Sequence, residues 1–148
     1  MIRGNASEIL ALAGGSNQGK GVDSGDSVTD AEAVSMGFAQ AQETVVAITG
    51  ETDFVTDGTR AVRVSGGSAW MPRVTAMGCS LTAAIGAMVA VADDPFWATV
   101  AALELFGFCG AQAAHEARGP GSFQVAFLDA LAQITPDEFG SSALVEVL

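Results

Sequence analysis

Basic residues and cysteines are scarce in this sequence. Six Lys and Arg stand against 17 Asp and Glu, which gives a net charge of −11 over 148 residues. This negative charge repels polyanions, so nucleic acids and anionic membranes are poor partners, and a phosphate ligand must be held by local groups. The two cysteines, Cys79 and Cys109, are too few for a disulfide scaffold.

Long apolar runs are missing as well. The longest uncharged apolar stretch, residues 81–92, is too short to span a bilayer. The chain opens without the charged and then apolar segment of a secretory signal, so we expect a cytoplasmic location. The composition is 49% hydrophobic and 16% charged, which is typical of a folded chain with a sizeable core. We therefore expect residues 1–148 to form a single domain.

The pattern of apolar residues predicts an α/β fold. The run Val45–Thr49, ended by a glycine, predicts a buried parallel strand. Two further strands, residues 53–56 and 60–64, flank Asp57-Gly58, which is a strong hairpin signal. Helices are predicted from Asn5 to about Ala13 and from about Ala31 to Gln42, the second with Thr29 or Asp30 as its cap. A third is predicted over residues 79–92. Two more are predicted from Pro95 to about Ala117, with Asp94 as cap, and after Ser122, which is the cap of the last helix. Three or four strands are few for so much apolar helix surface, which indicates part of a larger sheet. The tail after Pro136 is expected to be loosely attached.

Residues 74–82 predict a loop that enters the N-terminus of an apolar helix. Residues 79–92 carry no charge and are apolar nearly all round, which predicts a helix buried on every side. The first helical turn offers unpaired backbone N–H groups and the positive end of the helix dipole. Gly78 allows close approach and Cys79 stands beside it, so this helix start is a candidate anion hole. The alternative, which the local pattern alone favours, is a glycine loop followed by a small core residue.

Other candidate residues have simpler interpretations. Asn5 and Glu8 have the spacing of a capping box, which by itself explains both. Residues 14–21 approach a P-loop, but a glycine stands where the motif needs Ser or Thr, and the segment follows a helix. A flexible connector is the better interpretation. Cys109 is predicted to be a core residue and His115 a surface residue.

Five short motifs follow one another along the chain in an order and at spacings compatible with those of one known protein family. They are Ile2-Arg3-Gly4-Asn5-Ala6-Ser7-Glu8-Ile9, Gly21-Val22-Asp23-Ser24, Val55-Thr56-Asp57-Gly58, Arg73-Val74-Thr75 with Gly78-Cys79-Ser80, and Gly119-Pro120-Gly121-Ser122-Phe123. Over about residues 2–136 the chain resembles the C-terminal portion of hydroxyethylthiazole kinases, ribokinase-like enzymes of thiamine salvage. The resemblance implies a ribokinase-like three-layer α/β/α fold, here incomplete because the N-terminal strands are missing.

The resemblance also implies an activity and a set of site residues. The activity is phosphorylation of the hydroxyl of 4-methyl-5-(2-hydroxyethyl)thiazole by ATP with Mg²⁺, in a trimer with active sites at subunit interfaces. The implied roles are Asn5 and Glu8 for the metal, Arg3 and Thr49 for ATP, Ala76 for the substrate, and Gly78 and Cys79 for catalysis. We expect the mouth at Gly78 to face Arg3, Glu8 and Thr49 across one nucleotide cleft.

The chemistry of these residues agrees with the resemblance. Phosphoryl transfer depends on positioning of the reactants and neutralisation of charge more than on covalent catalysis. Fixed backbone N–H donors can stabilise the negative charge that develops on the transferred phosphoryl group. Mg²⁺ often touches only one or two carboxylates, so Glu8 can suffice. A thiol at a helix N-terminus ionises more readily, so Cys79 could accept the hydroxyl proton.

One departure from the family pattern bears on the site. The family has Gly-Thr-Gly-Cys where this chain has Ala76-Met77-Gly78-Cys79, and a Cβ at Ala76 is costly if the position needs a positive φ. Two alternatives to a kinase are a truncated remnant without activity and a non-catalytic nucleotide-binding or association module. Exposed apolar faces would favour association.

Overall fold

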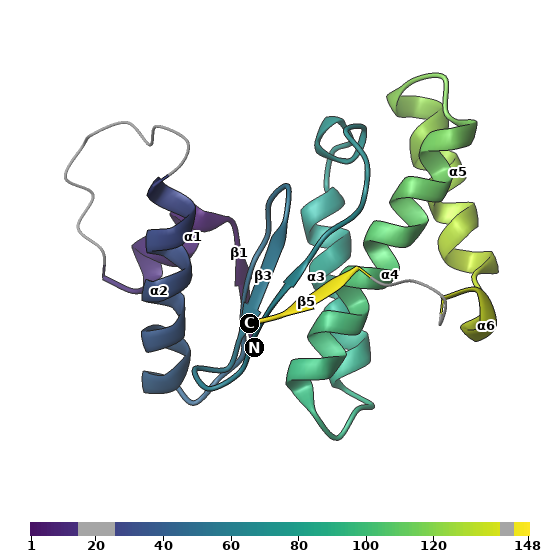
Figure 1. Cartoon of the computed structure of the whole chain (residues 1–148). Helices are drawn as coiled ribbons and strands as arrows, with labels where there is room; N and C mark the ends of the chain where they lie inside the picture. Colours follow the sequence, from purple (N-terminus) through teal and green to yellow (C-terminus); the bar gives the residue numbers. More distant parts are fainter. Residues whose placement is uncertain (15–25, 140–143) are drawn as a thin grey trace. The chain divides into compact units, whose positions relative to one another are not determined.

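A computed structural model describes residues 1–14, 26–139 and 144–148. The chain divides into two compact units, Met1–Arg63 with Glu146–Leu148, and Val64–Val145 (Figure 1). The sheet belongs mainly to the first unit and the long helices belong to the second. The α/β class predicted from the sequence is confirmed. The single-domain expectation stays a prediction.

The first unit is built on a sheet whose strand order is β1-β2-β3-β4-β5. Its elements are β1 (Ile2–Gly4), α1 (Ala6–Leu12), α2 (Asp26–Ala41), β2 (Val46–Ile48), β3 (Asp53–Thr56), β4 (Ala61–Val64) and β5 (Val145–Val147). β1 pairs with β2 in parallel, with Ile2 opposite Val46, and β2 pairs antiparallel with β3. β2 is buried along its length, which confirms the predicted buried parallel strand. Because β1 and β2 are parallel, their carboxyl ends meet at one edge of the sheet.

Helices α1 and α2 lie side by side against the strands of this unit (Figure 1). Apolar residues of both helices and of β2, β3 and β4 form its core. These residues are Ile9, Ala31, Ala39, Val46, Ile48, Phe54 and Ala61. Helix α2 begins at Asp26, so the prediction of a cap at Thr29 or Asp30 is wrong. Several Ser, Thr and Asp residues follow one another there, and cap preference alone does not choose among them.

The predicted hairpin joins β3 to β4. The Asp57 carboxylate accepts hydrogen bonds from the backbone N–H groups of Thr59 and Arg60, at 2.9 Å and 2.7 Å. Burial raises the pKa of Asp57, but these hydrogen bonds and those from the Arg60 and Thr59 side chains outweigh it and hold the pKa well below its usual range. The turn is therefore closed by its own side chains, as the Asp-Gly signal predicts.

The second unit is helical. It contains the 3₁₀ turn Met71–Arg73, α3 (Met77–Val89), α4 (Pro95–Glu116), α5 (Pro120–Gln133) and α6 (Pro136–Phe139). Helix α4 packs against both α3 and α5, and the Phe106 and Phe127 rings meet edge to face at 4.9 Å. The Phe96 N–H donates to Asp94 Oδ1 at 2.9 Å, which confirms the predicted cap. Cys109 is buried and His115 is exposed, as predicted.

Helix α4 is the one helix in the described ranges that is long and apolar enough to cross a membrane. However, 56% of its apolar window is buried inside the protein, and a core helix passes the same test.

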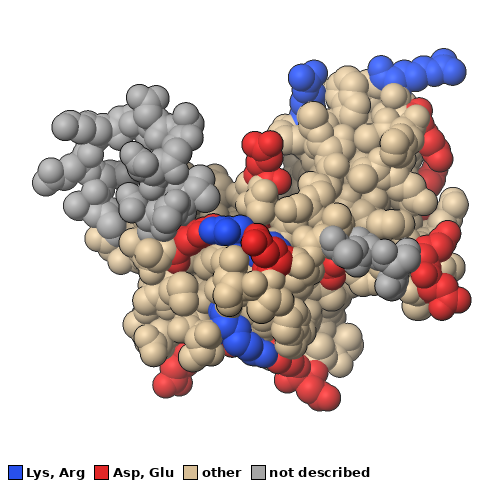
Figure 2. Space-filling view, in the orientation of Figure 1, with Lys and Arg blue, Asp and Glu red and all other residues tan. Residues whose placement is uncertain are grey.

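On the face shown in Figure 2, the described acidic side chains are spread out and the basic ones stand apart from one another. They form no basic patch there.

The prediction that the helix over 79–92 is buried on every side is wrong. In α3 only Leu81 and Ile85 are buried. The exposed positions carry small side chains, namely Cys79, Ser80, Thr82, Ala83, Gly86 and Ala87. Small side chains present little apolar area to water, so an uncharged helix of this kind need not be enclosed.

The predicted cap of the last long helix is also wrong. Helix α5 begins at Pro120 with Gly119 as its N-cap, because proline suits the first helical position. Ser122 lies inside the first turn. Its hydroxyl accepts from the backbone N–H groups of Arg118 and Gly119, at 2.8 Å and 3.2 Å.

The described end of the chain, residues 144–148, is held by hydrogen bonds, which differs from the loose attachment expected after Pro136. Within the second unit, the Leu144 carbonyl accepts from the Ser65 N–H at 2.9 Å, and the Leu144 N–H donates to the Glu104 carboxylate. In the first unit, the Leu148 N–H donates to the Ala61 carbonyl at 3.1 Å. Backbone pairing that composition does not reveal therefore fixes residues 144–148.

Candidate functional site

Arg3 and Thr49 come together at the carboxyl ends of β1 and β2. The Arg3 guanidinium donates through Nη2 to Thr49 Oγ1 at 2.5 Å. The Thr49 N–H donates to the Gly4 carbonyl at 2.9 Å, and the Thr49 hydroxyl lies 3.4 Å from the same oxygen. The parallel pairing of the two strands produces this arrangement, and this sheet edge is where open α/β sheets bind ligands.

One buried donor of the Arg3 guanidinium is unsatisfied within the described part of the chain. Arg3 Nε is buried and has no hydrogen-bond partner among the described residues. A buried N–H without an acceptor costs about 1–3 kcal/mol, so such a group calls for an explanation. An acceptor brought by a ligand would satisfy it.

Asn5 and Glu8 form the predicted capping box at the start of α1. Asn5 Oδ1 accepts from the Glu8 N–H at 2.9 Å and from the Ser7 hydroxyl at 2.8 Å, and the Asn5 N–H donates to Glu8 Oε2 at 2.7 Å. Both lone pairs of the Asn5 carbonyl oxygen are thus used. Glu8 Oε1 has no partner among the described residues, and the side chain is exposed.

This arrangement is compatible with Mg²⁺ held through one carboxylate. The described ranges contain no group of three or more His, Cys, Asp or Glu that could hold a metal ion. Mg²⁺ is commonly bound through one or two carboxylates together with waters and substrate phosphates. Glu8 can supply one such oxygen. Gly4 leaves room for the Glu8 side chain, because a Cβ at position 4 would lie 3.0 Å from Glu8 Cβ and 3.0 Å from Glu8 Oε2.

Asp53 belongs to the same neighbourhood but was not among the residues predicted from the sequence. Its Oδ1 accepts from the Gly50 N–H at 2.9 Å across the turn between β2 and β3. Burial raises the pKa of Asp53 to about 6, although the Gly50 hydrogen bond and the positive charge of Arg3 oppose the rise. The available sequence signal was an acidic residue four positions after Thr49, at the start of the next strand.

The start of α3 has the features of an anion hole within the second unit. The first helical hydrogen bond runs from the Ser80 N–H to the Ala76 carbonyl at 2.9 Å, and Ala76 offers no side-chain cap. The N–H groups of Met77, Gly78 and Cys79 therefore precede the helical ladder, and no partner for them is found in the described part of the chain. Cys79 is exposed, so the alternative of a small core residue is wrong.

Ala76 adopts a left-handed conformation, with φ 66° and ψ 10°. The position therefore has the positive φ at which a Cβ is costly, so the condition stated for Ala76 in the sequence analysis is met. The side chain is exposed.

Contacts with α4 hold the loop that leads to α3. The Gly67 N–H donates to the Gly107 carbonyl at 3.1 Å. A Cβ at Gly110 would lie 2.7 Å from Met71 Sδ. The glycines of α4 thus allow close packing of this loop. Arg73 lies over the Trp70 ring at 5.2 Å from its centroid.

These observations define first a class of protein. The first unit has polar side chains at the ends of its parallel strands, and the second unit has an exposed helix start with amides that lack a partner among the described residues. Each feature by itself is typical of α/β domains that bind phosphorylated ligands. The family described as "HK: Hydroxyethylthiazole kinase family" matches residues 1–137, and the chain belongs to this family.

Individual relatives agree with this assignment. The chain is 56% identical over 146 residues to a hydroxyethylthiazole kinase of Cereibacter sphaeroides, covering 99% of this chain and 55% of the relative. It is 58% identical over 138 residues to that of Gemmatimonas aurantiaca, covering 93% and 50%. A solved hydroxyethylthiazole kinase structure from Pyrococcus horikoshii OT3 has a TM-score of 0.82 at 34% identity, covering 99% of this chain and 54% of that one. The chain thus spans about half the length of the relatives it matches.

Proposed function

We propose that this chain carries phosphoryl-transfer residues of a kinase that uses ATP and Mg²⁺ to phosphorylate the hydroxyl of 4-methyl-5-(2-hydroxyethyl)thiazole. The family match over residues 1–137 is the observation that carries this proposal. The paired Arg3 and Thr49 and the open helix start at Gly78 support it. By the same resemblance, we propose that the protein assembles as a homotrimer, which sedimentation analysis would test.

Arg3 and Thr49 are proposed to bind ATP. The planar guanidinium suits phosphate oxygens, and its buried Nε–H needs an acceptor. The bond to Thr49 fixes the plane of the guanidinium, and Thr49 is itself tied to Gly4 through its backbone. The pair is therefore preorganised for an anion.

Glu8 is proposed to hold Mg²⁺ through its free carboxylate oxygen, with Asn5 positioning the carboxylate. Because the Asn5 carbonyl oxygen already accepts two hydrogen bonds, its part is to orient Glu8. Bound Mg²⁺ would neutralise charge on the phosphates during transfer.

The start of α3 is proposed to carry the chemistry on the alcohol. The hydroxyl oxygen attacks the γ-phosphorus of ATP, ADP leaves with the electrons of the broken bond, and the hydroxyl proton passes to the Cys79 side chain as the base. The backbone N–H groups at Gly78 and Cys79 would stabilise charge on the transferred phosphoryl group. Ala76, which is exposed beside them, is proposed to contact the substrate.

Substitution of Cys79 tests the base role in an enzyme of complete length. Cys79→Asp keeps a group that can accept a proton, so we expect activity to be retained or raised. Cys79→Ala should lower kcat by about 10²- to 10⁴-fold. Ala87→Ser, at an exposed site further along α3, is the control and should leave kcat unchanged. A loss in Cys79→Asp as deep as that in Cys79→Ala would rule out the base role.

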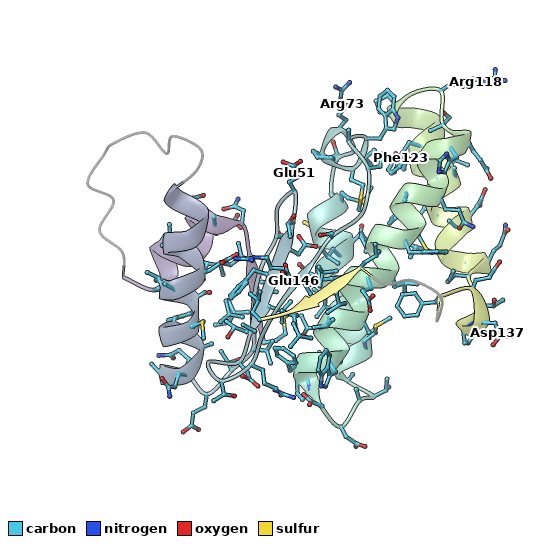
Figure 3. The ribbon with its side chains drawn as sticks, in the orientation of Figure 1. Glu51, Arg73, Arg118, Phe123, Asp137 and Glu146 are labelled. Carbon is cyan, nitrogen blue, oxygen red and sulfur yellow. The ribbon has the colours of Figure 1, made fainter. Side chains whose placement is uncertain are left out.

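Thermal unfolding tests nucleotide binding in the chain as it stands. Mg-ATP at a hundredfold excess over its Kd should stabilise the native protein by about 2.7 kcal/mol and raise the Tm. Arg3→Ala should abolish the rise, whereas Arg118→Ala, which removes an exposed charge at the turn before α5, should preserve it (Figure 3). A rise without turnover of the thiazole alcohol would favour a non-catalytic nucleotide-binding module. No rise would contradict the proposal for this chain.

A further inference from the structure

We propose that Asp53 is a positioning residue for Arg3 and Thr49: its carboxylate closes the turn that carries Thr49 and sets the electrostatic environment of the Arg3 guanidinium. This inference rests on the proposed nucleotide-binding role of those two residues. It adds an acidic partner to a set for which the sequence suggested only Arg3 and Thr49.

The geometry of the turn is the first support. Residues 49–52 connect β2 to β3, and Ile48 and Phe54 are opposite one another in the register. Within this turn, Asp53 Oδ1 accepts from the Gly50 N–H at 2.9 Å. Since Gly50 follows Thr49 directly, this bond restricts the backbone that presents the Thr49 hydroxyl.

The placement of Arg3 is the second support. Arg3 lies on β1 and is tied to Thr49 on the other side of the same turn. Of the charged groups in the described residues, Arg3 is the one whose charge lowers the pKa of Asp53. The interaction is mutual, so the ionised carboxylate favours the observed position of the guanidinium. A half-buried carboxylate that costs stability when ionised is typical of functional positions rather than of structural ones.

Asp53→Asn is the informative substitution, because it keeps an oxygen that can accept from Gly50 and removes the charge beside Arg3. Glu51→Gln is the matched control. It removes one negative charge from the same turn, where Glu51 points away from the sheet (Figure 3) and is exposed. Circular dichroism would confirm that both variants fold.

The first measurement is independent of activity. In protein labelled with ¹⁵N-arginine, the Arg3 Nε–H signal is assigned by its absence in Arg3→Lys. In the wild type and in Glu51→Gln this signal should shift with pH around pH 6, as Asp53 ionises. In Asp53→Asn the shift should be lost. A signal that titrates unchanged in Asp53→Asn, or that titrates in no protein, would overturn the coupling of Asp53 to Arg3.

The second measurement is the Kd for Mg-ATP near neutral pH. We expect Asp53→Asn to raise the Kd by about three- to tenfold and Glu51→Gln to leave it unchanged. If Asp53 merely repelled phosphate, its neutralisation would tighten binding, so tighter or unchanged binding would overturn the inference, as would equal effects in both variants. If the wild type binds no ATP, the proposed function fails for this chain, while the Arg3 titration still decides whether Asp53 sets the environment of Arg3.

Discussion

Ala76 is the residue whose backbone conformation departs most clearly from what its side chain prefers within this site. A left-handed conformation costs a residue with a Cβ about 1–2 kcal/mol, and glycine avoids that cost. Glycine also loses more entropy on folding, so the two effects partly cancel. The net effect should still favour glycine.

We therefore predict that Ala76→Gly raises the free energy of unfolding by about 0.5–1 kcal/mol. Urea unfolding with an unchanged m-value would measure it. Ala83→Gly, at an exposed position inside α3, is the comparison and should instead lower stability by a similar amount. Destabilisation by Ala76→Gly would mean that the left-handed conformation is not kept in solution.

The raised pKa of Asp53 predicts how stability depends on pH. The pKa is about 6 in the folded protein against 3.8 for an unperturbed aspartate, so the folded state binds the proton more tightly. This contribution to stability is fully present below about pH 4 and is lost as the pH rises to about 6. The whole effect is about 3 kcal/mol, because each unit of pKa corresponds to about 1.4 kcal/mol.

Asp53→Asn does not titrate, so it should match the wild type near pH 4 and exceed it by about 1–3 kcal/mol at neutral pH. Denaturant unfolding of both proteins over this range measures the difference. A gap that stays constant with pH would show that Asp53 does not titrate as described.

At the scale of elements, Gly58 governs how the β3–β4 hairpin meets α2. Its φ is +89°, and a Cβ there would lie 2.6 Å from Gln40 Cβ and 2.7 Å from the Gln40 backbone nitrogen. An alanine would therefore be strained in conformation and would also push against the helix backbone, which cannot give way.

We predict that Gly58→Ala lowers the free energy of unfolding by about 2–4 kcal/mol. Gly50→Ala is a suitable control in the neighbouring turn, because the nearest atom to its added Cβ is the Thr52 carbonyl oxygen at an ordinary 3.6 Å. Equal and small effects in both variants would show that α2 does not pack on the hairpin as described.

Elements were predicted well where the signal is local. The Asn5–Glu8 box, the Asp94 cap before Pro95 and the Asp57-Gly58 turn each depend on groups two or three residues apart. The exposure of much of α3 was not predicted, because an uncharged helix of small residues fits both an enclosed and an exposed environment. The start of α5 was misplaced by three residues, because the preference of Pro120 for the first turn outweighs that of Ser122 for the cap.

At the scale of the whole molecule, the two thiols should react very differently. Cys79 is exposed, whereas Cys109 is buried and burial raises its pKa to about 11. Since the thiolate is the reactive form, Cys109 is doubly protected in the native protein.

The chain has two cysteines, Cys79 and Cys109. We predict that a thiol reagent modifies only Cys79 in the native protein and modifies both cysteines after denaturation. Cys79→Ala should remove the fast reaction and leave the slow one. Rapid modification of two thiols under native conditions would contradict the buried position of Cys109. If Mg-ATP slowed the reaction of Cys79, the proposed site would gain independent support.

The sequence by itself determined the α/β class, the family resemblance and the features that neighbouring residues create, because caps and turns arise from chemistry within a few residues. Only the tertiary structure decided which distant residues meet. Arg3 and Thr49 are 46 positions apart and touch because two parallel strands end at one edge. The part played by Asp53 is likewise decided there, since its burial and its proximity to Arg3 exist only once the sheet has formed.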